Sequence, residues 1–153
     1  MSAARLTHPL ISLQDTMSTQ SCQALRKALL DLHRILVELE RRVYERQHGP
    51  QSSGDFLQVM AYAEEMRWLE PLSRLIVMLD EALDGAGDAQ QAATPLAVAQ
   101  RARELLHLDR DSAEVFVTRY LWHFDAAPEL VQAHAATLAA LKAVGTRAQG
   151  EER

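Results

Sequence analysis

The chain has 153 residues, so we expect one domain with one core. Its 16 Lys and Arg residues against 21 Asp and Glu residues give a net charge of -5, which argues against a general nucleic-acid-binding role. The single cysteine, Cys22, excludes a disulfide within the chain and indicates a reducing compartment, so we expect a cytoplasmic protein.

The two ends of the chain carry no targeting pattern. The first residues hold one Arg, Pro9 and scattered apolar side chains, without the continuous apolar run of a signal peptide. No segment approaches the roughly 18 apolar residues that a membrane span needs, so we expect no membrane partner. We expect a flexible lead-in over residues 1–17, a helical domain over 18–145 and a disordered tail over 146–153.

The first predicted helix begins at Ser18 or Thr19, which can cap its N-terminus, and ends before Gly49 and Pro50. Within it, apolar residues alternate in steps of three and four, the pattern of a helix that packs along a seam. These residues are Cys22, Leu25, Leu29, Leu32, Leu36, Leu39 and Val43. A monomeric bundle and a homodimer that shares this helix bury the same seam, so both remain open. In the homodimer, the interface residues are Leu25, Leu29, Leu32, Leu36 and Leu39.

The second helical stretch runs from near Asp55 toward Asp84 and contains Pro71. Proline lacks a backbone N–H and clashes with the preceding turn. The sequence therefore predicts either a kink at Pro71 or a break, with two helices that meet near Trp68 to Glu70.

Three shorter helices complete the predicted domain, after a polar loop over residues 85–93. The third runs from Thr94 and Pro95 to about His107, and the fourth covers residues 113–124. The fifth begins at Pro128 and ends at Gly145. Composition favours helix throughout, since Ala and Leu dominate and no stretch alternates as a strand does. The fold class is an all-α bundle of five to six mostly antiparallel helices.

Two Glu-x-x-His pairs have the spacing of metal ligands in helical bundles, namely Glu45 with His48 and Glu104 with His107. Both pairs lie off the apolar face of their helices, whereas ligands must project into the core. We therefore expect neither a metal nor a cofactor.

Other polar and aromatic residues fall on or near the apolar faces. His134 is in register with Leu130 and Leu141, so it is either a ligand group or a core-edge histidine with one hydrogen bond. Trp122 points away from the other aromatic residues of its helix, which favours a partner contact or cover by a neighbouring helix. The candidate ligand-binding residues are His134, His123, Tyr120, Trp68 and Ser73.

Three segments resemble an uncharacterised family of small bacterial all-helical proteins. Residues 44–49 match its YERxHG segment, residues 68–81 match WLxPLSxLIVxxDE, and residues 132–136 match a histidine-containing stretch of its last helix. The resemblance covers about residues 25–144 and departs at 62–67, where the family has Asp-Pro-x-Phe-Ala. It implies an all-helical fold and no particular activity. The residues that it marks for testing are Tyr44, His48, Trp68, Pro71, Ser73, Asp80 and Glu81.

The sequence contains no P-loop, no dinucleotide-binding glycine pattern, no Cys-x-x-Cys and no nucleophile elbow. The seam and the lack of a converging polar cluster favour a non-enzymatic protein-interaction or regulatory bundle that self-associates. The alternative is a bundle that binds a small ligand or metal in its interior. A small-molecule enzyme is a third hypothesis.

Overall fold

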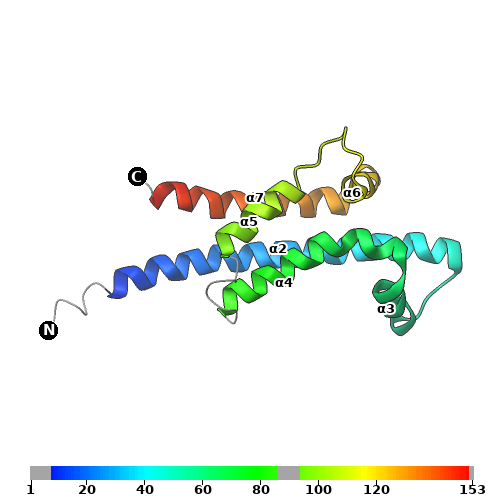
Figure 1. The fold of residues 1–153 in the computed structure, drawn as a ribbon, viewed down its shortest axis with the longest axis horizontal. Helices are drawn as coiled ribbons and strands as arrows, with labels where there is room; N and C mark the ends of the chain where they lie inside the picture. Colours follow the sequence, from blue (N-terminus) through cyan, green and yellow to red (C-terminus); the bar gives the residue numbers. More distant parts are fainter. Residues whose placement is uncertain (1–7, 86–93, 152–153) are drawn as a thin grey trace.

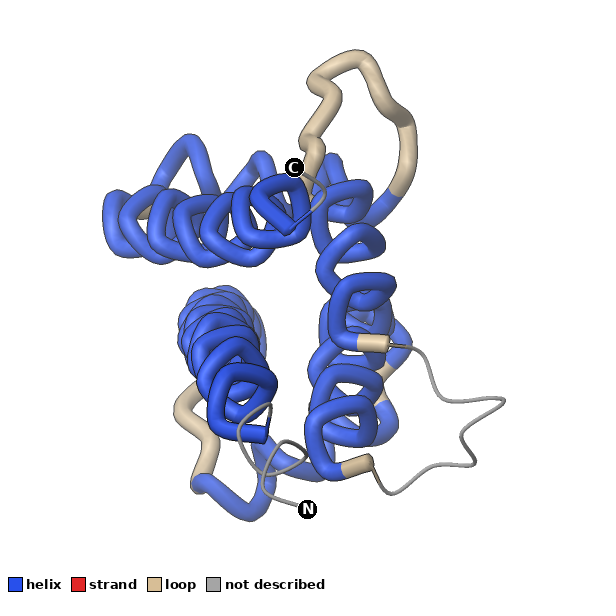
Figure 2. Tube along the Cα trace, turned by 90° about the vertical axis from the view of Figure 1, so that its left-hand side faces the viewer, coloured by secondary structure: helices blue, strands red, loops and turns tan. Residues whose placement is uncertain are grey.

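The computed structural model describes residues 8–85 and 94–151, with side chains over 19–85 and 94–144 (Figure 1). These residues form six α-helices and one 3-10 helix and contain no strand (Figure 2). The helices are α2 (His8–His48), α3 (Ser53–Tyr62), η1 (Glu64–Leu69), α4 (Glu70–Asp84), α5 (Pro95–Leu105), α6 (Val115–Ala126) and α7 (Pro128–Glu151). The predicted all-α bundle is therefore confirmed.

The core lies along α2, which is 41 residues long and extends along the whole molecule (Figure 1). Helices α4 and α7 run antiparallel to it, and α7 is its most extensive partner. The leucines of the predicted seam are all buried in this shared core, together with residues of α4, α5, α6 and α7. The five residues assigned to a homodimer interface are therefore core residues of a single chain.

Two helix ends differ from the prediction. Helix α2 already includes residues 8–17, ahead of the start predicted at Ser18 or Thr19, and Pro9 lies at the N-terminal end of its described part, where a missing N–H costs little. It ends at His48 as predicted, since Gly49 adopts a φ of 87°. Helix α7 continues through Gly145, at a cost of only about 1 kcal/mol for a helical glycine, and ends at Glu151.

Residues 1–7, 86–93 and 152–153 lie outside the described residues. They include most of the predicted loop over 85–93 and parts of the predicted lead-in and tail. The flexibility of the lead-in and the disorder of the tail stay predictions.

The kink predicted at Pro71 is not confirmed. Pro71 lies in the first turn of α4, where proline is compatible with the helix. The second stretch changes direction earlier, at Ala63, which has an extended backbone with ψ of 130° and separates α3 from η1. Leu69, which joins η1 to α4, is helical, so these two elements follow each other directly. This arrangement brings Trp68 of η1 into the core.

Side-chain caps begin two of the helices. Ser52 Oγ accepts from the backbone N–H of Asp55 at the start of α3, and Thr94 Oγ1 accepts from that of Ala97 at the start of α5. In the described part of the chain, no helix is both long and apolar enough to cross a bilayer.

Candidate functional site

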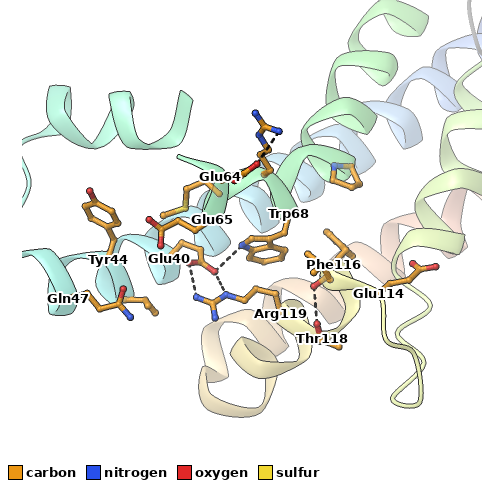
Figure 3. A pocket seen from close by; sticks show the side chains of 15 residues that line it. Glu40, Tyr44, Gln47, Glu64, Glu65, Trp68, Glu114, Phe116, Thr118 and Arg119 are labelled. Carbon is orange, nitrogen blue, oxygen red and sulfur yellow. Dashed lines mark hydrogen bonds and ion pairs between the residues drawn. The ribbon is translucent and has the colours of Figure 1, made fainter. Parts of the chain in front are cut away.

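The carboxylate of Glu40, on α2, is buried and accepts four hydrogen bonds. Its Oε1 accepts from Trp68 Nε1 at 3.0 Å, Arg119 Nε at 2.7 Å and His123 Nε2 at 2.9 Å. Its Oε2 accepts from Arg119 Nη2 at 3.1 Å (Figure 3). The side chain of Glu40 is only 3% exposed. We call these four residues the Glu40 network.

Three elements supply the network. Arg119 and His123 lie four residues apart on α6 and therefore share one face of that helix. Trp68 comes from the last turn of η1, and its ring centroid lies 6.1 Å from that of His123. Glu40 directly follows the seam residue Leu39 on α2. The network therefore fixes η1 and α6 against the C-terminal third of α2.

The ionisation of Glu40 follows from its partners. Burial by itself raises the pKa of Glu40, but the hydrogen bonds from His123 and Arg119 and the charge of Arg119 outweigh it. The net effect is a pKa below the ordinary value, so the group is an ionised carboxylate at neutral pH. A carboxylate that is already bound by four donors is suited to holding structure in place rather than to taking a proton from a substrate.

A groove of about 820 Å³ opens beside this network, between α2, η1 and the start of α6. Seven of its fifteen lining residues are apolar or aromatic, among them Met66, Trp68 and Phe116, which are buried. The ring centroids of Trp68 and Phe116 lie 5.8 Å apart. Tyr44 and Gln47 of α2 stand at one end (Figure 3).

The rim of the groove is acidic. Glu64, Glu65 and Glu114 are exposed and lie around the Trp68 ring (Figure 3). Arg67 pairs with Glu64 at 3.7 Å, and Arg119 pairs with Glu40. With Glu40, four carboxylates face two guanidinium groups, which leaves two net negative charges along the groove.

Trp122 is 51% exposed, and the guanidinium carbon of Arg119 lies 4.9 Å from its ring centroid. It borders a smaller hollow of about 620 Å³ between α2 and α6. The predicted role of Trp122 in a partner contact stays a prediction, and its position next to Arg119 places it just outside the groove.

The structure separates the five ligand-binding candidates into three places. Trp68 and His123 belong to the Glu40 network. Tyr120 Oη lies 2.7 Å from His134 Nδ1, and Ser73 Oγ lies 2.8 Å from His33 Nε2 while donating to the carbonyl of Leu69. Three hydrogen-bonded groups, rather than one ligand site, account for the five residues.

Residues of both Glu-x-x-His pairs have other partners in the structure. The ring of His48 packs on Tyr44 with centroids 4.3 Å apart, and Glu45 accepts from Arg41 Nε at 3.1 Å. Glu104 accepts a long hydrogen bond of 3.4 Å from Gln100. Over the residues that the structure describes, no three His, Cys, Asp or Glu side chains gather closely enough to hold a metal ion.

Glu40 and Arg119 were not among the candidate residues predicted from the sequence. A weak signal for Glu40 exists, since it lies four residues after Leu36 and therefore close to the buried stripe of α2. The Trp68 indole N–H is a second signal, because a buried Trp needs an acceptor. For Arg119 we find no local signal.

The stability of the fold is expected to fall as the pH drops through 6.5. Burial lowers the pKa of both His33 and His134 below the ordinary value of 6.5. The unfolded chain therefore takes up protons before the folded chain does, and the free energy of unfolding decreases. Urea denaturation at pH 7.5, 6.5 and 5.5 measures this slope, in a range above the titration of Glu40.

In the variant with His33→Gln and His134→Asn, the Gln amide nitrogen can still donate to Ser73 and the Asn amide oxygen can still accept from Tyr120, but neither side chain titrates. We expect a flatter profile than that of the wild type. Gln132→Asn, an exposed neighbour on α7, is the control and keeps the wild-type slope. An unchanged slope in the double variant would assign the pH dependence to other groups.

Comparison of this chain with protein-family models, with curated proteins and with solved structures finds no match. The function is therefore inferred from the geometry of the site.

Proposed function

We propose that this protein is a non-catalytic protein-interaction module that binds a basic, amphipathic helical segment of a partner protein in the groove beside Glu40. The observation that carries the proposal is the combination of an apolar floor with an acidic rim. Apolar side chains of a partner helix would contact Val43, Pro71 and Val115, which line the groove and are exposed or half-buried. Lys or Arg residues flanking them would pair with Glu64, Glu65 and Glu114.

The Glu40 network supports binding rather than catalysis. General acid–base chemistry needs a titratable group that can reach the substrate and exchange a proton with it. Both oxygens of Glu40 are already occupied by Trp68, Arg119 and His123. The three rim carboxylates are exposed to solvent. Apart from the Glu40 network and the rim carboxylates, the groove is lined mainly by apolar side chains, which suit binding rather than proton transfer.

Rigidity of the groove favours affinity. The indole of Trp68 is fixed by its hydrogen bond to Glu40 and by its packing against Phe116. A wall that is ordered before binding loses less conformational entropy when a partner arrives.

The predicted self-association through α2 is not part of this proposal, because its leucines are buried in the core of one chain. The proposed partner is instead a different protein with a basic segment. An acidic rim also opposes binding of nucleic-acid phosphates.

The test uses a fluorescein-labelled synthetic helix of 14 residues with leucines on one face and lysines flanking them. Fluorescence anisotropy measures its affinity for the wild type and for the double variant Glu65→Gln, Glu114→Gln. We expect about fivefold weaker binding by the variant, since each exposed rim charge contributes roughly 0.5 kcal/mol. Binding by the wild type is expected to weaken in 0.5 M NaCl.

The double variant Glu38→Gln, Glu81→Gln is the matched control. It removes the same charge from exposed positions on α2 and α4 that do not line the groove. We expect it to bind as the wild type does. Equal weakening in both double variants, or equal affinity for a helix with Glu in place of Lys, would overturn the proposal.

A further inference from the structure

A second hollow, of about 450 Å³, lies between the C-terminal end of α5, the loop that follows it, α6 and α7. Of the eleven residues that line it, five are basic, six are apolar and none is acidic. Leu121 and Phe124 of α6 line this hollow, whereas Phe116 and Arg119 of the same helix line the groove. A lining that contains arginine and lysine but no carboxylate is suited to an anionic ligand.

Arg103 supplies a fixed positive charge to this hollow. Its Nη2 donates to the carbonyl oxygen of Leu141 at 2.7 Å, and its Nη1 donates to Gln100 Oε1 at 3.2 Å. Both acceptors are uncharged, and no carboxylate of the described residues pairs with this guanidinium. Arg110, by contrast, binds both carboxylate oxygens of Asp125 and adds little net charge.

His134 supplies a neutral hydrogen-bond donor. The hydroxyl of Tyr120 is buried, and burial raises its pKa, so it keeps its proton and needs an acceptor. That acceptor is His134 Nδ1, at 2.7 Å. Burial lowers the pKa of His134, so the ring is neutral and its proton is on Nε2. This N–H has no hydrogen-bond partner within the described residues.

The length of the hollow follows from α7. Leu141, whose carbonyl holds Arg103, lies seven residues after His134 on the same face of the helix, which corresponds to about 10 Å along its axis. Leu138 lies between them and is 44% exposed. The hollow therefore places a cation near one end, a neutral donor near the other and an apolar surface between them.

We propose that this hollow binds an elongated amphipathic carboxylate, with its carboxylate at Arg103 and its apolar chain over Leu138 and Phe124. An acyl chain of about eight carbons matches the length of this surface. The site is separate from the groove assigned to a partner protein and does not depend on that assignment.

Isothermal titration calorimetry with sodium octanoate tests the proposal on the full chain. We expect octanoate to bind at least tenfold more tightly than octanol or octylammonium, which share its chain and lack its charge. Arg103→Gln is expected to weaken octanoate binding about tenfold, because a charge-assisted contact is lost. Arg101→Gln is the matched control, since Arg101 is exposed on the same helix and does not line the hollow.

Leu138→Asp is a second variant, placed at an exposed position so that the fold is retained. It puts a carboxylate on the apolar surface and is expected to abolish octanoate binding. Equal affinities for octanoate and octanol would overturn the proposed anion site. Equal affinities of the Arg103→Gln and Arg101→Gln variants for octanoate, or full binding by Leu138→Asp, would place the ligand elsewhere.

Discussion

Replacing Glu40 with alanine is expected to lower the free energy of unfolding by about 3 kcal/mol. The change leaves three donors without their acceptor. Two of them, the Trp68 indole and the His123 imidazole, are buried and cannot turn to water instead. The third, Arg119, is partly exposed, so its share of the loss is smaller. Urea denaturation at pH 7, followed by far-UV circular dichroism, measures the change.

Glu38→Ala is the control for this variant. Glu38 lies on the same helix, is exposed and is expected to contribute less than about 0.5 kcal/mol. Glu40→Gln separates charge from shape, because an amide keeps one acceptor oxygen but turns an NH2 group toward some of the former donors. We expect it to fall between the wild type and Glu40→Ala. If Glu40→Ala cost no more than Glu38→Ala, the network would not hold η1 and α6 against α2.

Replacing Leu32 with alanine is expected to cost about 3 kcal/mol of unfolding free energy. The side chain of Leu32 is 0% exposed within the core of one chain, so the loss combines lost burial with a cavity. Because the seam is buried within a single chain, we expect the denaturation midpoint to be independent of protein concentration. Urea titrations at two concentrations a hundredfold apart measure both quantities.

Leu30→Ala is a matched control, with the same substitution two residues away on the same helix. Leu30 is 38% exposed, and we expect a loss below about 1 kcal/mol. A wild-type midpoint that rises with protein concentration, together with a Leu32→Ala midpoint that does not, would contradict the internal packing of the seam. That result would restore the homodimer predicted from the sequence.

The periodic part of the fold could be predicted because it depends on local spacing. Leu25, Leu29 and Leu36 were expected on one face of a long helix, and all three are buried. The spacing does not predict which helices pack against that face. A heptad seam buries equally well against helices of its own chain and against a second copy. The choice depends on where α4 and α7 lie, which is set by contacts between residues far apart in the sequence.

The Glu40 network could not be predicted for the same reason, because its contacts join residues far apart in the sequence. Glu40 lies in a run of charged residues, and such a run is typical of a solvent-exposed helix face. Its partners Arg119 and His123 are 79 and 83 residues away, so no local pattern connects them. The break at Ala63 is similar, because alanine has no preference for an extended backbone and only the packing around η1 imposes it.

The sequence separation within the Glu40 network also sets the order in which the protein is completed during synthesis. Glu40 leaves the ribosome with α2, while its guanidinium and imidazole donors follow only 79 and 83 residues later. Until then its carboxylate stays hydrated, and one wall of the groove does not exist. A nascent or truncated chain that ends before α6 can therefore contain the whole of α2 and yet offer no binding surface. If the groove binds a partner as proposed, this ability is acquired only after the chain has been made through residue 123.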